Sequence, residues 1–375
     1  MDIFGQPWLL VPNKVRADGG RELDRFRGVT PPRDTPNGAE AWVGSMTRAN
    51  GITKENPHLG CAEVILPDGR REFLVDVVER APEQVLGKKH MDYYGHSLGM
   101  LIKMIDAKTP FLLQCHPTRE NAQKFWNSHY GKEECWYILG TRTDTQEPPY
   151  ILLGFKEGIT REKLEKAYRL GDKDRLEALC HRIPVKPGEC YLIPGGVPHA
   201  LGAGCFVAEI QEPSDLTAVP FPQEYLLAYR RKANPLGVFV PEDEKLYETR
   251  MLNTFRYEGM TEDNLIRWLK SKETVLRDEP GGREIEIFGD QDTSSFSCTV
   301  VKVSGSMERR NTGDVQIGIV LSGSGTLRCK DSCIPVKQGS EVFFPFHAEN
   351  VILEGDFSMI LCNPGVTASY KETSD

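Results

Sequence analysis

Short runs of apolar residues, separated by clusters of Gly, Pro, Asp and Asn, recur along most of the chain. Apolar runs of this length between turn residues are typical of strands, in which side chains alternate between two faces. The runs occupy residues 98–105, 110–115, 136–139, 149–154, 185–193 and 206–210 in the first part of the chain, and 296–303, 315–321, 325–328, 333–336, 342–344 and 357–361 in the last part. The pattern therefore predicts a mainly β protein.

Apolar positions change to helical spacing in two regions. Near residues 159–182 the spacing predicts a helical insertion, and either Asp172 or Asp174 is a suitable N-cap for its second part. Residues 243–255 and 261–272 are also predicted to be helices, the latter beginning at Thr261. The stretch 118–130 is polar and predicts an excursion between two strands.

A candidate metal site follows from two blocks on these strands. Gln114 and His116 are two residues apart, so on a strand both point to one face, and Glu134 opens the next apolar run. His199 ends a Gly-x5-Pro-x-Gly-x2-His pattern that begins at Gly188. Two imidazoles, a carboxylate and an amide oxygen suit a divalent ion such as zinc and leave positions open for water or substrate. The alternative is a barrel with buried polar residues.

The two blocks resemble known sequence motifs. The second resembles the second cupin motif, and the first resembles its Gln-x-His variant in type I phosphomannose isomerases. Further similarities to this family are found in Glu40-Ala41-Trp42-Val43-Gly44, Lys103-Met104-Ile105-Asp106-Ala107, Ala208-Glu209-Ile210-Gln211 and Ser214-Asp215. The resemblance implies two cupin (jelly-roll-like) β-barrels with helical insertions. It also implies the interconversion of mannose 6-phosphate and fructose 6-phosphate, with one zinc ion per chain or another divalent metal.

The reaction that the resemblance implies gives roles to several ionisable residues. Moving a proton between C1 and C2 of a sugar needs a base outside the metal shell, and Glu209, inside an apolar run, is the first candidate. Lys103 and Lys132 are expected to assist by stabilising negative charge. Glu40 and Asp215 are expected to organise these lysines or the sugar hydroxyls.

Two positions depart from the family pattern. Family members usually carry an arginine four residues past the aspartate of the Ser-Asp pair, where this chain has Val219, and Leu201 replaces an aromatic residue seen in some relatives. Either Arg230 or Arg231 supplies the missing cation, or the substrate carries less negative charge, or turnover is poor. The first alternative function is therefore an isomerase of another sugar or sugar phosphate. A non-catalytic, metal-bound sugar-binding protein is a further alternative.

The last part of the chain repeats part of the motif. The residues from Gly339 to Pro345 have the same Gly-x5-Pro spacing, but no histidine follows at the matching place and His347 is displaced. We expect a degenerate, metal-free second cupin at 283–375, a helical connection at 220–282, and an N-terminal arm with the metal-binding cupin at 1–219. The arm, up to about residue 38, is expected to pack against the first barrel.

Composition limits the other functions that the chain can have. A length of 375 residues with a net charge of −8 argues against a nucleic-acid or anionic-membrane surface. No basic segment precedes an apolar core at the start, and no window approaches about 18 apolar residues. The ten cysteines are scattered singly, which suits reduced thiols. We expect a cytoplasmic enzyme of carbohydrate metabolism whose partner is a small sugar or sugar phosphate. The sequence leaves its oligomeric state open.

Overall fold

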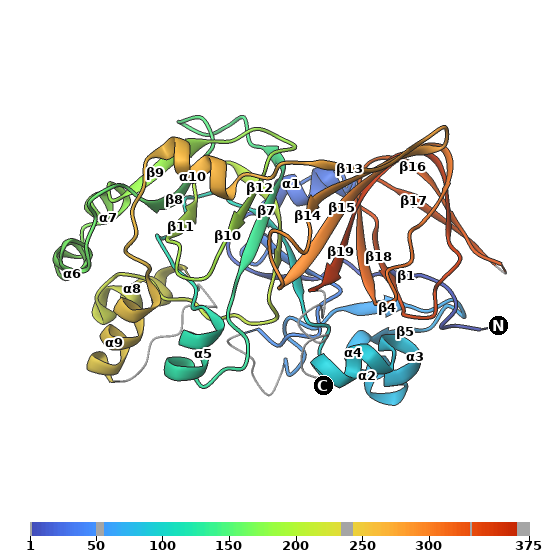
Figure 1. The fold of residues 1–375 in the computed structure, drawn as a ribbon, viewed down its shortest axis with the longest axis horizontal. Coiled ribbons are helices and arrows are strands. Elements are labelled where there is room, and N and C mark those ends of the chain that lie inside the picture. Colours follow the sequence, from blue (N-terminus) through green and yellow to red (C-terminus); the bar gives the residue numbers. More distant parts are fainter. Residues whose placement is uncertain (1, 50–55, 234–242, 331, 366–375) are drawn as a thin grey trace.

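Three antiparallel sheets carry most of the regular backbone (Figure 1). The computed structural model describes residues 2–49, 56–233, 243–330 and 332–365. Strands outnumber helices, so the predicted mainly β class is confirmed. Within the described ranges, no helix is both long and apolar enough to span a membrane.

The largest sheet contains most of the strands from the last part of the chain. In spatial order its path is β13 (Thr274–Glu279), β14 (Gly282–Phe288), β15 (Phe296–Glu308), β19 (Ile352–Pro364), β16 (Gln316–Arg328), β18 (Glu341–Phe344), β1 (Trp8–Leu10), β4 (Glu63–Ile65) and β5 (Arg71–Phe73), and β17 (Cys333–Lys337) pairs with β16 beside this path. Three strands from the first 73 residues thus extend a sheet formed mainly by the last hundred.

A six-stranded sheet and a three-stranded sheet form the part of the fold that carries the predicted motifs. The six-stranded sheet has the order β10 (Cys190–Ile193), β7 (Glu134–Thr141), β12 (Cys205–Gln211), β6 (Leu101–Asp106), β3 (Glu40–Val43) and β2 (Lys14–Arg16). The smaller sheet has the order β11 (His199–Leu201), β8 (Tyr150–Phe155) and β9 (Cys180–Pro184). An isolated bridge between Gln114 and His199 holds the residues of the two motif blocks side by side.

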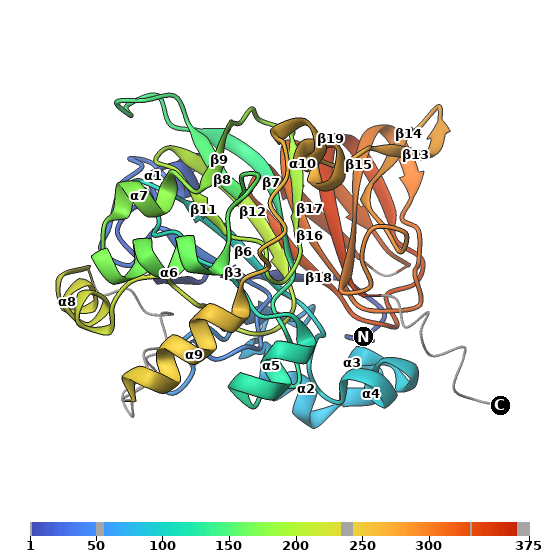
Figure 2. The ribbon, with the colours of Figure 1, turned by 60° about the vertical axis from the view of Figure 1, so that its left-hand side comes forward.

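Ten helices lie in the described ranges, mostly at the margins of the sheets (Figure 2). They are α1 (Arg21–Phe26), α2 (Leu74–Arg80), α3 (Pro82–Leu86), α4 (Lys88–Tyr94), α5 (Arg119–Trp126), α6 (Arg161–Leu170), α7 (Lys173–Glu177), α8 (Gln223–Ala233), α9 (Glu244–Thr254) and α10 (Glu262–Leu269). Asp172 caps α7 and Thr261 caps α10, as predicted, because each side chain accepts a backbone N–H of the first turn.

The N-terminal arm contacts the second part of the fold as well as the first part, against which it was expected to pack. Trp8 pairs with Phe343 of β18, their rings stack with centroids 5.4 Å apart, and Trp8 is fully buried. A few residues later β2 pairs with β3 in the six-stranded sheet. The arm therefore belongs to both sheets. The domain limits given above stay predictions.

One apolar core joins the two large sheets. It contains Cys135 and Cys190 of the six-stranded sheet together with Cys298 and Cys362 of the ten-stranded sheet. Burial of such a shared apolar surface is the main favourable contribution to the stability of both sheets. The two parts consequently stabilise each other.

Candidate metal centre

Two histidines and a glutamate meet in the protein interior. Glu134 begins β7 and His199 begins β11. His116 follows Cys115, which forms an isolated β-bridge with Ala218. Glu134 Oε2 lies 3.2 Å from His116 Nε2, and Glu134 Oε1 lies 3.4 Å from His199 Nε2. All three side chains are buried, and their potential ligand atoms lie within 4.8 Å of one another.

Backbone carbonyls orient both imidazoles. His116 Nδ1 lies 2.8 Å from the carbonyl oxygen of Leu216, and His199 Nδ1 lies 2.9 Å from that of Val197. Because a carbonyl only accepts, each Nδ1 donates a hydrogen and each Nε2 keeps its lone pair. Burial lowers the pKa of His116, with a further contribution from the charge of Lys132, and burial lowers the pKa of His199 to about 3. Both rings are therefore neutral near pH 7, as metal ligation requires.

Unpaired buried atoms test whether these residues suit a metal ion. Glu134 Oε1 and His199 Nε2 are buried and have no hydrogen-bond partner among the described residues. Leaving a buried polar atom unpaired costs about 1–3 kcal/mol, so such atoms need a partner. A divalent cation bound by two imidazole nitrogens and a carboxylate would satisfy both atoms. The chemistry of the three side chains therefore fits a metal ion.

Two glutamines lie beside this cluster. The backbone of Gln114 exchanges two hydrogen bonds with that of His199, at 3.0 and 2.9 Å, so the predicted fourth ligand is adjacent to the cluster. Its role as a ligand stays a prediction. Gln211, which was not singled out as a site residue, lies opposite Glu134 in the register of β12 and β7. Its Nε2 donates to backbone carbonyls, and its buried Oε1 has no hydrogen-bond partner in the part of the chain that the structure describes.

Lys132 contacts the cluster directly. Its Nζ lies 2.5 Å from both His116 Nε2 and Glu134 Oε2. Burial opposes ionisation of Glu134, but the charge of Lys132 and contacts with the two imidazoles lower the pKa of Glu134 well below its usual value. Glu134 is therefore a carboxylate with a full negative charge.

Lys103 and Glu209 form a second buried ion pair next to Lys132. Lys103 Nζ donates to Glu209 Oε1 at 3.0 Å, and the indole N–H of Trp136 donates to Glu209 Oε2 at 3.0 Å. The two residues lie opposite each other on β6 and β12, which explains how residues 106 positions apart in the chain meet. Lys132 Nζ is 3.9 Å from Glu209 Oε1. The predicted base is thus outside the His–Glu–His cluster but within reach of two cations.

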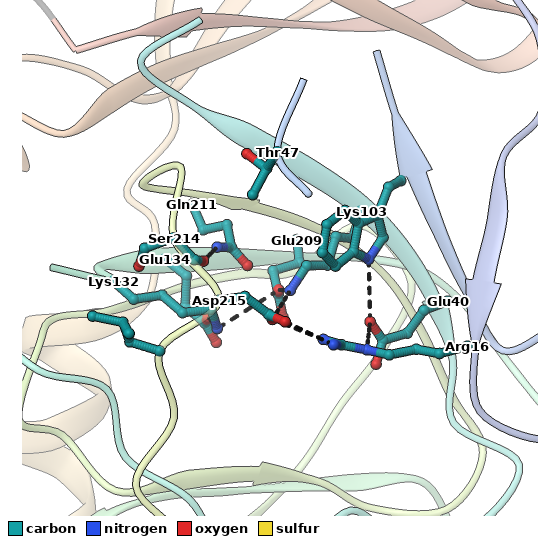
Figure 3. Close-up of polar contacts among 12 residues, drawn as sticks. Arg16, Glu40, Thr47, Lys103, Lys132, Glu134, Glu209, Gln211, Ser214 and Asp215 are labelled. Atoms are coloured by element: carbon teal, nitrogen blue, oxygen red, sulfur yellow. Dashed lines mark hydrogen bonds and ion pairs between the residues drawn. The ribbon is translucent and has the colours of Figure 1, made fainter. Parts of the chain in front are cut away.

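Asp215 and Glu40 extend the chain of charges to Arg16. The Nη1 and Nη2 atoms of Arg16 donate to the two Asp215 oxygens at 2.8 and 2.9 Å, and its Nε donates to Glu40 Oε2 at 2.9 Å. Lys103 Nζ lies 3.9 Å from Asp215 Oδ1. Burial opposes ionisation of Asp215, but Arg16 and Lys103 lower its pKa to about 2. Figure 3 shows the resulting row of alternating charges, with Arg16 at one end and Lys132 and Glu134 at the other.

Arg16 was not predicted as a site residue. It lies in the short segment Lys14-Val15-Arg16, in which the sequence gives no sign that an arginine is buried. Its contact with Asp215 joins residues 199 positions apart in the chain, and the pairing of β2 with β3 places Arg16 opposite Glu40. Burial of both Glu40 and Asp215 requires a nearby cation. That requirement is the signal in the sequence that could have pointed to a buried arginine such as Arg16.

The positions that depart from the family pattern are also located. Val219 is buried in an apolar cluster, and its carbonyl accepts a hydrogen bond from the hydroxyl of Tyr247. Leu201 is buried on β11. The side chains of Arg230 and Arg231 lie outside the described residues. Val219 therefore contributes to packing, whereas Arg16 contacts Asp215 directly.

Antiparallel sheets that enclose a His–Glu–His cluster define a protein of the cupin class with a candidate metal centre. Residues 290–364 match the family model "Mannose-6-phosphate isomerase, cupin domain", which confirms the cupin assignment. The proteins to which the chain is similar carry the same name.

Similarity to proteins named mannose-6-phosphate isomerase extends over almost the whole chain. The chain is 28% identical to "Probable mannose-6-phosphate isomerase GmuF" of Bacillus subtilis (strain 168), over 94% of this chain and 96% of that protein. It is 35% identical to "Mannose-6-phosphate isomerase ManA" of the same organism, over 35% of this chain and 41% of that protein. The crystal structure of the mannose 6-phosphate isomerase from Bacillus subtilis has the same fold, with a TM-score of 0.70, 22% identity and coverage of 96% of this chain and 99% of that chain.

Proposed function

We propose that the protein is a metal-dependent aldose–ketose isomerase that interconverts mannose 6-phosphate and fructose 6-phosphate. Gln114, His116, Glu134 and His199 hold one zinc ion in this proposal. The observation that carries it is the cluster of His116, Glu134 and His199 with its two unpaired ligand atoms, next to a separate Lys–Glu pair. The relatives named mannose-6-phosphate isomerase support the substrate.

The Lys103–Glu209 pair suits the proton transfer of such a reaction. Isomerisation removes the proton from C2 of the aldose and returns one to C1, while negative charge develops on the sugar oxygens. A bound divalent ion supplies electrostatic stabilisation of that charge. Glu209 takes and returns the proton in our proposal, because both of its oxygens are held by Lys103 and Trp136 and it is not one of the proposed metal ligands. Lys132, with Lys103, keeps positive charge beside it.

The phosphate contact is the less specified part of the proposal. Arg230 and Arg231 are proposed to contact the phosphate, on the ground that α8 follows Val219 closely in the chain. Val219 favours a second candidate, an isomerase of the same mechanism acting on another sugar or sugar phosphate. Replacing each arginine by alanine distinguishes the two candidate functions. If either arginine contacts the phosphate, its variant should have a raised KM for phosphorylated sugars.

The direct test is isomerase activity of the zinc-reconstituted protein with mannose 6-phosphate, mannose and several other sugar phosphates. We expect the highest kcat/KM with mannose 6-phosphate. His199→Ala is expected to lose zinc and activity together, because it removes a ligand, whereas His347→Ala, on the exposed loop after β18, keeps both. An active His199→Ala protein without metal would refute the site. Sugar binding without exchange of the C2 proton would indicate a binding protein instead.

We also propose a cytoplasmic location. All ten cysteines carry free thiols in the structure, and nine of them are buried. Free thiols are the usual form of cysteine in a reducing compartment.

A further inference from the structure

Arg16 makes contacts that are unusual for a phosphate-binding arginine. All three guanidinium nitrogens donate to carboxylates, two to Asp215 and one to Glu40. The side chain is 7% exposed. One cation between two carboxylates leaves this group with a net charge of −1, which repels a phosphate. Arg16 therefore does not replace the missing family arginine as a direct contact to the substrate phosphate.

The contacts of Asp215 connect Arg16 to the proposed proton-transfer pair. Asp215 accepts both parallel hydrogen bonds from Arg16, and Lys103 Nζ is 3.9 Å away from it and 3.0 Å from Glu209. Lys103 is therefore placed between two carboxylates and makes its hydrogen bond to Glu209. Both oxygens of Asp215 meanwhile accept hydrogen bonds from the guanidinium of Arg16.

Removal of the Arg16 guanidinium would change which carboxylate Lys103 contacts. Asp215 and Glu40 would then lose three hydrogen bonds from a buried cation, a loss that is costly for buried carboxylates. Lys103 is placed to compensate, since a movement of roughly 1 Å brings its ammonium from 3.9 Å to hydrogen-bonding distance of Asp215. The same movement takes it away from Glu209.

We propose that Arg16 is a positioning residue that holds Lys103 on Glu209 by satisfying Asp215 and Glu40. This inference rests on the proposed isomerase function, because Glu209 and Lys103 are the groups whose geometry matters for proton transfer. Arg16 acts through them without touching the sugar. A lysine cannot do the same, because a single ammonium cannot form the two parallel bonds to Asp215 and the third to Glu40.

The experiment compares Arg16→Ala and Arg16→Lys with Arg27→Ala. Arg27 is a matched control in the same arm: its side chain is 5% exposed and pairs with the buried Glu341 on β18, away from the charged row. Kinetics with the best sugar phosphate, zinc content and circular dichroism are measured for each protein. The crystal structure of Arg16→Ala is determined as well.

A misplaced catalytic pair lowers kcat and leaves substrate binding intact. We expect kcat to fall about 100-fold in Arg16→Ala and by a smaller factor in Arg16→Lys, with KM and zinc content close to wild type. Arg27→Ala is expected to keep the wild-type kcat. In the crystal structure of Arg16→Ala, Lys103 should contact Asp215 and leave Glu209.

Three results would overturn the proposal: a loss confined to KM, which indicates substrate contact; an equal loss of kcat in Arg27→Ala, which indicates a general structural effect; or a wild-type kcat in Arg16→Lys. If Arg16→Ala does not fold, Arg16→Lys decides by the same criteria. A wild-type protein that turns over no sugar phosphate would refute the isomerase function alone. The position of Lys103 in the variant structure would then decide the role of Arg16, and an unchanged Lys103–Glu209 contact would refute it.

Discussion

Burial gives the two site histidines an unusual protonation behaviour. His116 and His199 are both inside the protein, and the pKa of each is below the ordinary value for histidine, that of His199 at about 3. The unfolded chain therefore binds protons at these residues at a higher pH than the folded chain does. Acid consequently favours unfolding of the metal-free protein.

The sign and size of this effect can be measured. The contribution of neutral His199 is fully present above about pH 6.5 and is lost as the pH falls from there toward about 3, by about 1.5 kcal/mol between pH 6.5 and pH 5. We expect urea unfolding in the presence of a chelator to show this loss in the wild type and a smaller one in His199→Gln. His96→Gln, which changes a histidine whose side chain is 44% exposed, is the control and should keep the wild-type slope. Identical slopes in all three proteins would contradict the neutral state of His199.

The loop between β10 and β11 determines where His199 lies. Gly196 in this loop has a φ of +93° and donates its N–H to the carbonyl of His116 at 2.8 Å, so the loop contacts both histidine segments. A Cβ at this position would also overlap the side chain of Arg256. The Gly-x5-Pro-x-Gly spacing in the sequence thus has a geometric reason.

Gly196→Ala is expected to weaken metal binding. The positive φ costs about 1–3 kcal/mol for a non-glycine residue, and displacement of the loop should lower zinc affinity about 10- to 100-fold, the usual range for residues that orient ligands. Gly188→Ala is a matched control, because Gly188 has a φ of +90° and no atom within 4 Å of an added Cβ. It should lose similar stability and keep its zinc affinity. Competition with a chromophoric chelator measures both affinities, and an equal loss in both variants would refute the role of the loop.

The elements that local pattern determines were predicted well. Strand positions around Glu134, His199 and Glu209 follow from apolar runs, and α7 and α10 begin at the predicted caps. Local pattern failed where distant contacts decide the structure. The stretch 118–130 was read as a polar excursion but contains α5, whose exposed face is polar while Ala122 is buried. Residues 223–233 form α8, which lies within the predicted helical connection at 220–282.

In the candidate site, too, the residues in local motifs were predicted and the residue that depends on distant contacts was not. The three clustered ligands were predictable because each belongs to a short motif on a strand or a strand end. Arg16 was not, because its importance depends on Asp215, which lies far away in the chain. The Glu40–Arg16–Asp215 contacts exist only once β2 has joined β3.

At the scale of the whole molecule, the shared core predicts cooperative unfolding. Cys135 and Cys190 belong to one large sheet and Cys298 and Cys362 to the other, yet all four lie in one apolar core. Exposure of one pair therefore exposes the other. We expect the four thiols to become reactive toward an alkylating reagent at one urea concentration, as read by mass spectrometry.

Cys333 provides the internal control for this measurement, because it is exposed and should react without urea. Two separate midpoints, one for Cys135 and Cys190 and another for Cys298 and Cys362, would show that the two sheets unfold independently. That result would contradict the mutual stabilisation inferred from the core.

The path of the arm has a consequence for how the protein is made. Trp8 pairs with Phe343, and Arg16 follows Trp8 by eight residues, so the segment that carries Arg16 is synthesised long before the strand that pairs with Trp8. A chain terminated before β18 lacks the partner that fixes the arm, and with it the anchor that precedes Arg16. Synthesis must therefore pass β18 before the arm is fixed and the charged row can assemble, and chains terminated before β18 should be inactive even when they contain every proposed metal ligand.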